Sequence, residues 1–188
     1  MVKCIIISAL AVLGLAMIDD IRETATYYEY YESVTNTYII RYDAGWDEIR
    51  NIFARDTDAV VRDLQTNLTF NIRRTFGRYH ADVEPLTKED AAIMYEIWGG
   101  WSWARRPVAV YVNGYIFAGS LTNFPHGGVD ALPASANNLD AVKGNGVDGH
   151  MCLHFEGSRI HGSGRVNQDH MNAVAQARQA LQNKMTPQ

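Results

Sequence analysis

The sequence predicts an α+β domain made mostly of antiparallel β-hairpins, arranged as a sandwich or a barrel, with a mid-chain helix and a C-terminal helix. Two pairs of alternating apolar segments are each joined by a short polar turn, and several segments have apolar residues at helical spacing. The 188 residues are 47% hydrophobic and 20% charged. This composition is typical of a globular domain with one hydrophobic core.

The first half of the domain is expected to contain a short helix, a hairpin and the mid-chain helix. Residues 46–53 (WDEIRNIF) have apolar side chains at helical spacing. Residues 59–64 and 68–75 flank a polar turn and predict a β-hairpin. Residues 86–98 predict a helix with Thr87 as its N-cap, and the Gly-Gly pair that follows is a stop signal.

The second half begins with the clearer hairpin. Residues 107–112 and 115–121 flank an Asn-Gly pair, which is a strong hairpin signal. Residues 123–149 are a long, polar, glycine-containing loop of a kind that is usually functional. Residues 149–155 (GHMCLHF) predict a strand, and residues 167–184 predict the last helix.

The N-terminal segment predicts export. Residues 4–17 form an apolar run of about 14 residues after a weakly basic start, which is shorter than the roughly 20 of a membrane span and typical of a signal peptide. We therefore expect a protein of the cell envelope or the extracellular space, cleaved after Ala16. A short retained anchor, which would be the only membrane contact, and a buried N-terminal helix or strand are the alternatives.

The predicted organisation has three parts. Residues 1–18 are the signal peptide or short anchor, residues 19–56 are a tyrosine-rich lead-in suited to self-association, and residues 57–188 are a single catalytic-like domain. The formal net charge of −4 argues against a nucleic-acid partner bound by bulk charge. Two cysteines, Cys4 and Cys152, exclude a disulfide scaffold.

The most informative pattern surrounds Cys152. On a strand, His150, Cys152 and His154 project from one face, and the apolar residues between them project from the other, toward the core. One interpretation is a nucleophilic thiol with His150 or His154 as its base. A second is a zinc site, and a third is a set of imidazoles that only satisfy backbone groups. The alternative zinc ligands are His80, Asp82, His150, Cys152 and His154.

Three other segments are candidates for the same site. His126 precedes two glycines that let backbone approach a ligand closely. His80, Asp82 and Glu84 share a face if that segment is extended. Arg105 follows a cluster of tryptophans and is a candidate clamp for a substrate carboxylate.

These motifs resemble those of the L,D-transpeptidase catalytic domain, which cross-links bacterial peptidoglycan. That family has an upstream His-Gly, matched here by His126-Gly127, and a Ser-His-Gly-Cys-hydrophobic-Arg motif, matched by residues 149–154 (GHMCLH). Gly149, Met151 and His154 depart from the family's serine, glycine and arginine. The chain resembles more closely a group of secreted bacterial proteins with a similar HADVEPLT segment, PHG, GHxCxHF and SRxHG, often joined to peptidoglycan-binding modules.

The resemblance implies a cysteine enzyme that acts on wall stem peptides without a cofactor. Cys152 would attack a peptide carbonyl, His150 would act as base, and His126 would orient the base or bind substrate. The expected substrate contacts are Gly127, His154, Ser158, Arg159, His161 and Arg105. A zinc-dependent hydrolase, a non-catalytic wall-binding module and a self-assembling exported subunit are the alternatives.

Overall fold

The computed structural model describes residues 38–185, and the side chains of residues 38–183. The compact unit that contains the predicted site begins at Ile39. Residues 39–56, which the sequence analysis assigned to the lead-in, are therefore part of this unit. The predicted signal segment and the lead-in up to residue 37 lie outside the described residues.

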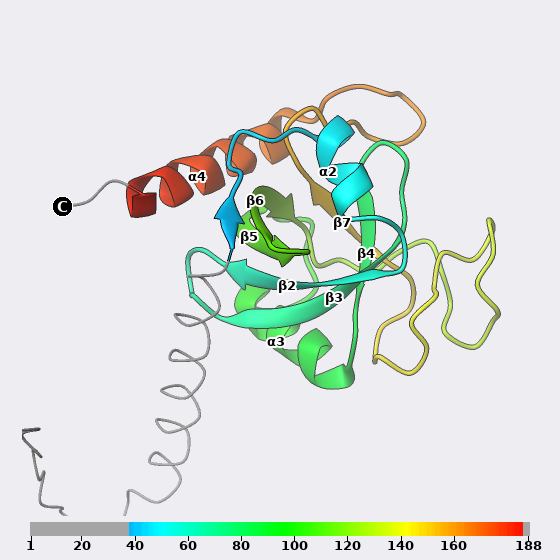
Figure 1. Ribbon diagram of the computed structural model, residues 1–188. Helices are drawn as coiled ribbons and strands as arrows, with labels where there is room; N and C mark the ends of the chain where they lie inside the picture. Colours follow the sequence, from blue (N-terminus) through cyan, green and yellow to red (C-terminus); the bar gives the residue numbers. More distant parts are fainter. Residues whose placement is uncertain (1–37, 186–188) are drawn as a thin grey trace, which may run out of the picture. The chain divides into compact units, whose positions relative to one another are not determined.

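Six antiparallel strands form a closed barrel (Figure 1). They are β2 (Thr57–Asp63), β3 (Thr69–Phe76), β4 (Ala81–Pro85), β5 (Arg106–Val112), β6 (Tyr115–Leu121) and β7 (Met151–His154). The strand order is β6-β5-β2-β3-β4-β7, and β7 pairs with β6 as well as β4, so the short strand β7 closes the barrel. A two-residue strand, β1 (Ile39–Ile40), adds to β6 in parallel. The predicted fold class is confirmed.

Both predicted hairpins are present. Strands β2 and β3 turn at Asn67, which has a positive φ of 64°, and β5 and β6 turn at Asn113 and Gly114 with φ of 48° and 81°. Asparagine and glycine tolerate this left-handed region at little cost. The buried Asp63 accepts hydrogen bonds from the backbone and hydroxyl of Thr66 inside the first turn.

Strand β4 is the element that the sequence analysis described only conditionally, as a segment whose residues share a face if extended. All five of its residues are buried. A strand that is covered on both faces lacks the alternation of apolar and polar residues that marks a half-buried strand in a sequence.

Between residues 38 and 185, three helices pack around the barrel: α2 (Trp46–Ile52), α3 (Lys88–Trp98) and α4 (Gln168–Met185). Thr87 and Asp90 form a reciprocal capping box at the start of α3, and Gly99 ends it in the left-handed conformation. Helix α4 packs along β5 and β6 (Figure 1). Among the described residues, no helix combines the length and apolar character needed to cross a membrane.

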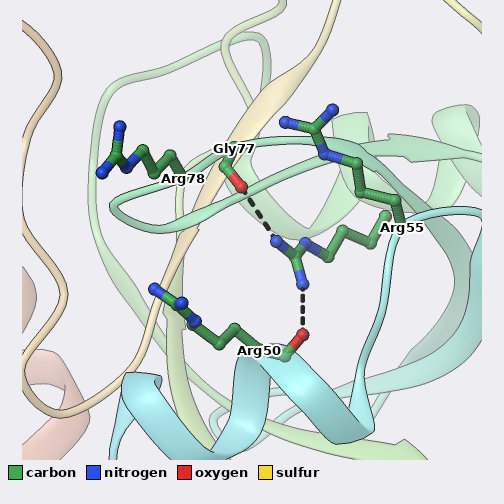
Figure 2. Close-up of a pocket in the computed structure, with 5 residues that line it drawn as sticks. Arg50, Arg55, Gly77 and Arg78 are labelled. Atoms are coloured by element: carbon green, nitrogen blue, oxygen red, sulfur yellow. Dashed lines mark hydrogen bonds between the residues drawn. The ribbon is translucent and has the colours of Figure 1, made fainter.

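Helix α2 is fastened to the barrel by the buried side chain of Arg74 (Figure 2). Its guanidinium donates to the carbonyls of Arg50 (2.9 Å), Phe53 (2.5 Å) and Gly77 (2.8 Å). It also lies over the ring of Trp46, 4.7 Å from the centroid. Burial lowers the pKa of Arg74 to about 10. A pocket of about 310 Å³ lies beside it, lined by Arg50, Arg55, Arg74, Gly77 and Arg78 (Figure 2).

Candidate active site

The site is built on the outer face of two neighbouring strands, β4 and β7. Val83 and Leu153 point into the core, as the predicted alternation requires. Asp82 of β4 is paired directly with Cys152 of β7, so their side chains share the outer face. The predicted inward orientation of Met151, Leu153 and Phe155 is confirmed, because all three belong to the hydrophobic core.

The long loop after β6 covers this face: the buried Glu84 of β4 holds it there, and the buried Asp140 ties two parts of the loop to each other. Glu84 accepts hydrogen bonds from the backbone N–H of Ala141 and Val142. Asp140 accepts from the N–H of Gly149 at 2.6 Å and pairs with Lys143 at 2.7 Å. The loop predicted at residues 123–149 is thus hydrogen-bonded to β4 and covers its outer face.

Glycines let two segments of this loop meet. His126 and His150 exchange two backbone hydrogen bonds of 3.0 and 2.9 Å. A Cβ at Gly149 would lie 2.2 Å from the carbonyl oxygen of His126, and one at Gly127 would lie 2.8 Å from the ring of His150. The glycines were predicted to let backbone approach a ligand. In the structure they let two segments of the loop approach each other.

Cys152 and His126 form a contact pair. The Sγ atom of the partly buried Cys152 lies 3.6 Å from Nε2 of His126. The other ring nitrogen, Nδ1, donates to the carbonyl oxygen of Phe124 at 3.0 Å. That bond assigns the proton of a neutral ring to Nδ1 and leaves Nε2 free to accept the thiol proton. Burial, aided by the negative charge of Asp82, raises the pKa of Cys152 to about 12.

His150, the residue predicted as base, packs its ring against that of His126, with centroids 4.3 Å apart. Its Nδ1 is 3.3 Å from the carbonyl oxygen of Leu139, and its Nε2 faces Oδ1 of Asp82 at 3.7 Å. The structure therefore brings His126, and not His150, against the thiol. Burial lowers the pKa of His150 to about 4.

Asp82 is the centre of a second group. His80 Nε2 and His161 Nε2 each lie 3.2 Å from Oδ1 of Asp82. Burial opposes the charge on Asp82, but hydrogen bonding from His161 and the neighbouring imidazoles outweigh it and hold its pKa below the ordinary value. The same hydrogen bond raises the pKa of His161.

His154 is buried in a stack of three imidazoles. Its ring lies 4.2 Å from that of His80 and 3.7 Å from that of His170, centroid to centroid. Burial lowers the pKa of His154 and brings that of His170 to about 3. His170 also bonds to the hydroxyl of Ser120 at 2.8 Å. His170 was not among the predicted site residues, because a single histidine in a helix has no partner visible in the sequence.

An exposed aromatic surface borders the thiol. Trp103 stacks on Phe124 with centroids 5.0 Å apart and packs against His126 at 4.8 Å. Trp103 is 46% exposed and Phe124 38% exposed. Arg105 donates to the carbonyl of Trp103, and its positive charge acts on Cys152 against the effect of burial.

The other predicted substrate-binding residues have different environments. Ser158 is fully buried, where its hydroxyl accepts a hydrogen bond from the N–H of Phe155. Arg159 is exposed, and its carbonyl oxygen bonds to Nδ1 of His80. Gly127 is exposed in the loop beside His126. The buried serine has no exposed surface with which to contact a substrate.

The predicted zinc ligands do not form one group. Among the described residues, one set of possible ligand atoms comes from His126, His150 and Cys152, and a second comes from His80, Asp82 and His161. Within each set the atoms lie within 4.8 Å of one another. His154 belongs to neither.

Together these features define a closed antiparallel barrel with a cysteine–histidine pair on the outside of its closing strand and a carboxylate–histidine group beside it. Comparison of the chain with protein-family models, curated proteins and solved structures finds no match. The functional argument therefore depends on the geometry of the site and on the motifs.

Proposed function

We propose that this domain is a cysteine acyltransferase or hydrolase that acts on stem peptides of the bacterial cell wall. The observation that supports the chemistry is the contact of Cys152 Sγ with His126 Nε2, with Nδ1 of the same ring held by a backbone carbonyl. A nucleophile, an adjacent base and a group that orients the base are the parts that covalent catalysis requires. The choice of substrate is supported by the sequence motifs.

In the proposed reaction, Nε2 of His126 takes the proton of the Cys152 thiol as sulfur attacks the carbonyl carbon of the bond before a terminal D-alanine. The resulting imidazolium gives that proton to the leaving amine, and D-alanine departs. A thioester remains on Cys152. An amine of a second stem peptide resolves it to a cross-link, or water resolves it to a shortened stem, and the thiol regains a proton.

The exposed rings of Trp103 and Phe124 provide a surface for the substrate next to the nucleophile. Arg105 adds a positive charge on the same side, which suits the carboxylates of wall peptides. His150 Nε2 faces Oδ1 of Asp82 at 3.7 Å, and Asp82 lies opposite Cys152 on the same face. In this proposal the role of base belongs to His126, and His150 is a positioning residue.

The test is an intact-mass measurement on the full chain after incubation with a tetrapeptide muropeptide, together with an assay of released D-alanine. We expect a thioester adduct on the wild-type chain and none on Cys152→Ala. The matched control is Cys4→Ala, which removes the other thiol and retains the adduct. His126→Gln should slow adduct formation about 100-fold or more, and more than His150→Gln does.

Absence of both the adduct and released D-alanine from the wild-type chain would overturn the catalytic proposal. Equal binding of wall material by the wild type and by Cys152→Ala, without turnover, would instead favour a binding module that uses the aromatic surface.

A further inference from the structure

The group formed by His80, Asp82 and His161 contains a buried nitrogen without a hydrogen-bond partner. His80 is 2% exposed, and its Nε2 is among the buried side-chain atoms that make no hydrogen bond. This atom nevertheless lies 3.2 Å from Oδ1 of Asp82, which is also 2% exposed. The two atoms face each other without hydrogen-bond geometry.

The hydrogen bond at the other ring nitrogen of His80 determines which nitrogen carries the proton. Its Nδ1 lies 2.8 Å from the carbonyl oxygen of Arg159, which only accepts, so Nδ1 carries the proton of the neutral ring. Nε2 then presents a lone pair to a carboxylate oxygen. A cation bound beside the two atoms would satisfy both of these buried acceptors at once.

The spacing fits a metal ion. In a tetrahedral zinc site with bonds of about 2.0–2.1 Å to nitrogen and oxygen, neighbouring ligand atoms lie about 3.3 Å apart. Both His80 Nε2 and His161 Nε2 lie 3.2 Å from Asp82 Oδ1. The bond from His80 Nδ1 to a backbone carbonyl is the support that metal-binding histidines almost always have.

We propose that His80 Nε2, Asp82 Oδ1 and His161 Nε2 bind one divalent transition-metal ion, with Zn²⁺ the best match to two imidazoles and a carboxylate. The His161 side chain is 47% exposed, so the fourth position opens toward solvent on its side. Three protein ligands with one open position are typical of zinc sites that also hold water. The site does not depend on the proposed function.

The neighbouring set of His126, His150 and Cys152 is the weaker candidate. His126 Nε2 lies against the thiol in this set, as His161 Nε2 lies against Asp82 in the other, so the ligand types and not the contacts separate the two sets. The negative charge of Asp82 offsets the positive charge of a dication. Among the described residues, the set of His126, His150 and Cys152 contains no carboxylate. The two sets predict different ligands: nitrogen and oxygen atoms in the first set, and nitrogen and sulfur atoms in the second.

The experiment is metal analysis of the tag-free full chain, purified without chelator, followed by titration with Zn²⁺ and Co²⁺. We expect about one ion per chain in the wild type and in Cys152→Ala, and a Tm that rises with Zn²⁺. His161→Ala changes an exposed residue, and it should weaken Zn²⁺ binding at least about tenfold and remove the rise in Tm. The bound Co²⁺ should show no thiolate charge-transfer band.

Failure of the wild-type chain to bind Zn²⁺ would overturn the inference. A thiolate-to-cobalt band, with loss of the ion in Cys152→Ala, would show that the ion binds His126, His150 and Cys152. That result would overturn this inference, and also the proposed function, which requires a thiol that is not bound to a metal. Zinc binding without an acyl adduct would overturn only the proposed function.

Discussion

At the scale of single residues, the site depends on hydrogen bonds that fix which ring nitrogen is available. The Nδ1 atoms of His80 and His126 are bonded to the carbonyls of Arg159 and Phe124. Each bond leaves one Nε2 aimed at its neighbour, Asp82 in the first case and the thiol in the second. Backbone carbonyls thus determine which nitrogen of each ring carries the proton, which the sequence alone does not show.

Gly149 gives a residue-scale prediction. It has φ of 87°, and an added Cβ would lie 2.2 Å from the carbonyl oxygen of His126. Gly144 has a similar φ of 73° but open space around it. Gly149→Ala should therefore cost about 1–3 kcal/mol more unfolding free energy than Gly144→Ala, measured by urea denaturation. Equal losses would contradict the contact with His126.

At the scale of elements, α2 and the turn between β3 and β4 are joined by one buried guanidinium. Arg74 makes no side-chain hydrogen bond to an acidic residue. Its guanidinium donates to four backbone carbonyls, those of Arg50, Phe53, Phe76 and Gly77. Removing the guanidinium leaves those buried carbonyls without hydrogen-bond donors, and each buried acceptor left unsatisfied lowers the free energy of unfolding.

Arg74→Met should lower the free energy of unfolding by about 3 kcal/mol or more. The control is the adjacent Arg73→Met, because Arg73 is partly exposed and pairs with Asp58 at 2.6 Å on the surface. That variant should lose at most about 1 kcal/mol. Denaturant unfolding of both variants provides the comparison, and similar losses would refute the fastening role.

The packing of α4 on β6 predicts a dependence of stability on pH. Burial lowers the pKa of His170 from 6.5 to about 3. Between these values the unfolded chain binds a proton that the folded chain does not, so stability is complete above about pH 6.5 and falls as the pH decreases.

His170→Asn keeps a donor or acceptor near the Nδ1 position that bonds to Ser120. The wild type should lose up to about 1.4 kcal/mol per pH unit relative to this variant between pH 6.5 and 3. Urea titrations at several pH values measure the difference. A difference that does not change with pH would show that His170 titrates normally in the folded state.

At the scale of the whole molecule, the sequence predicted the locally encoded parts best. Both hairpins, α3 and α4 have turn residues or caps within a few positions of their ends. Strand β4, by contrast, is buried on both faces, and its pairing with β7 joins distant segments. The shared face of His150, Cys152 and His154 followed from alternation.

The partners of that face could not be predicted in the same way. His161 meets Asp82 across 79 positions, and Cys152 meets His126 across 26 positions through a loop whose path depends on Glu84 and Asp140. Local periodicity contains no information on such contacts. The prediction of His150 as base followed from the strand face that it shares with Cys152 and from the family motif, whereas the structure places His126 in contact with the thiol.

The domain boundary is testable by truncation. Ile49 and Phe53 are fully buried in the core although they precede the boundary predicted at residue 57. A fragment that starts at residue 39 should show a single cooperative thermal transition, whereas one that starts at residue 57 should not. Each lost side chain removes about 1.5–3 kcal/mol of burial, out of a total of about 5–15 kcal/mol. A cooperative transition in the shorter fragment would restore the original boundary.

Strand β7 has a consequence for how reactivity arises during folding. The four residues that close the barrel also contain the thiol. Cys152 lies opposite Asp82 only when β7 has paired with β4. The rate at which Cys152 acquires its folded-state reactivity toward a thiol reagent therefore reports when β7 joins the sheet during refolding.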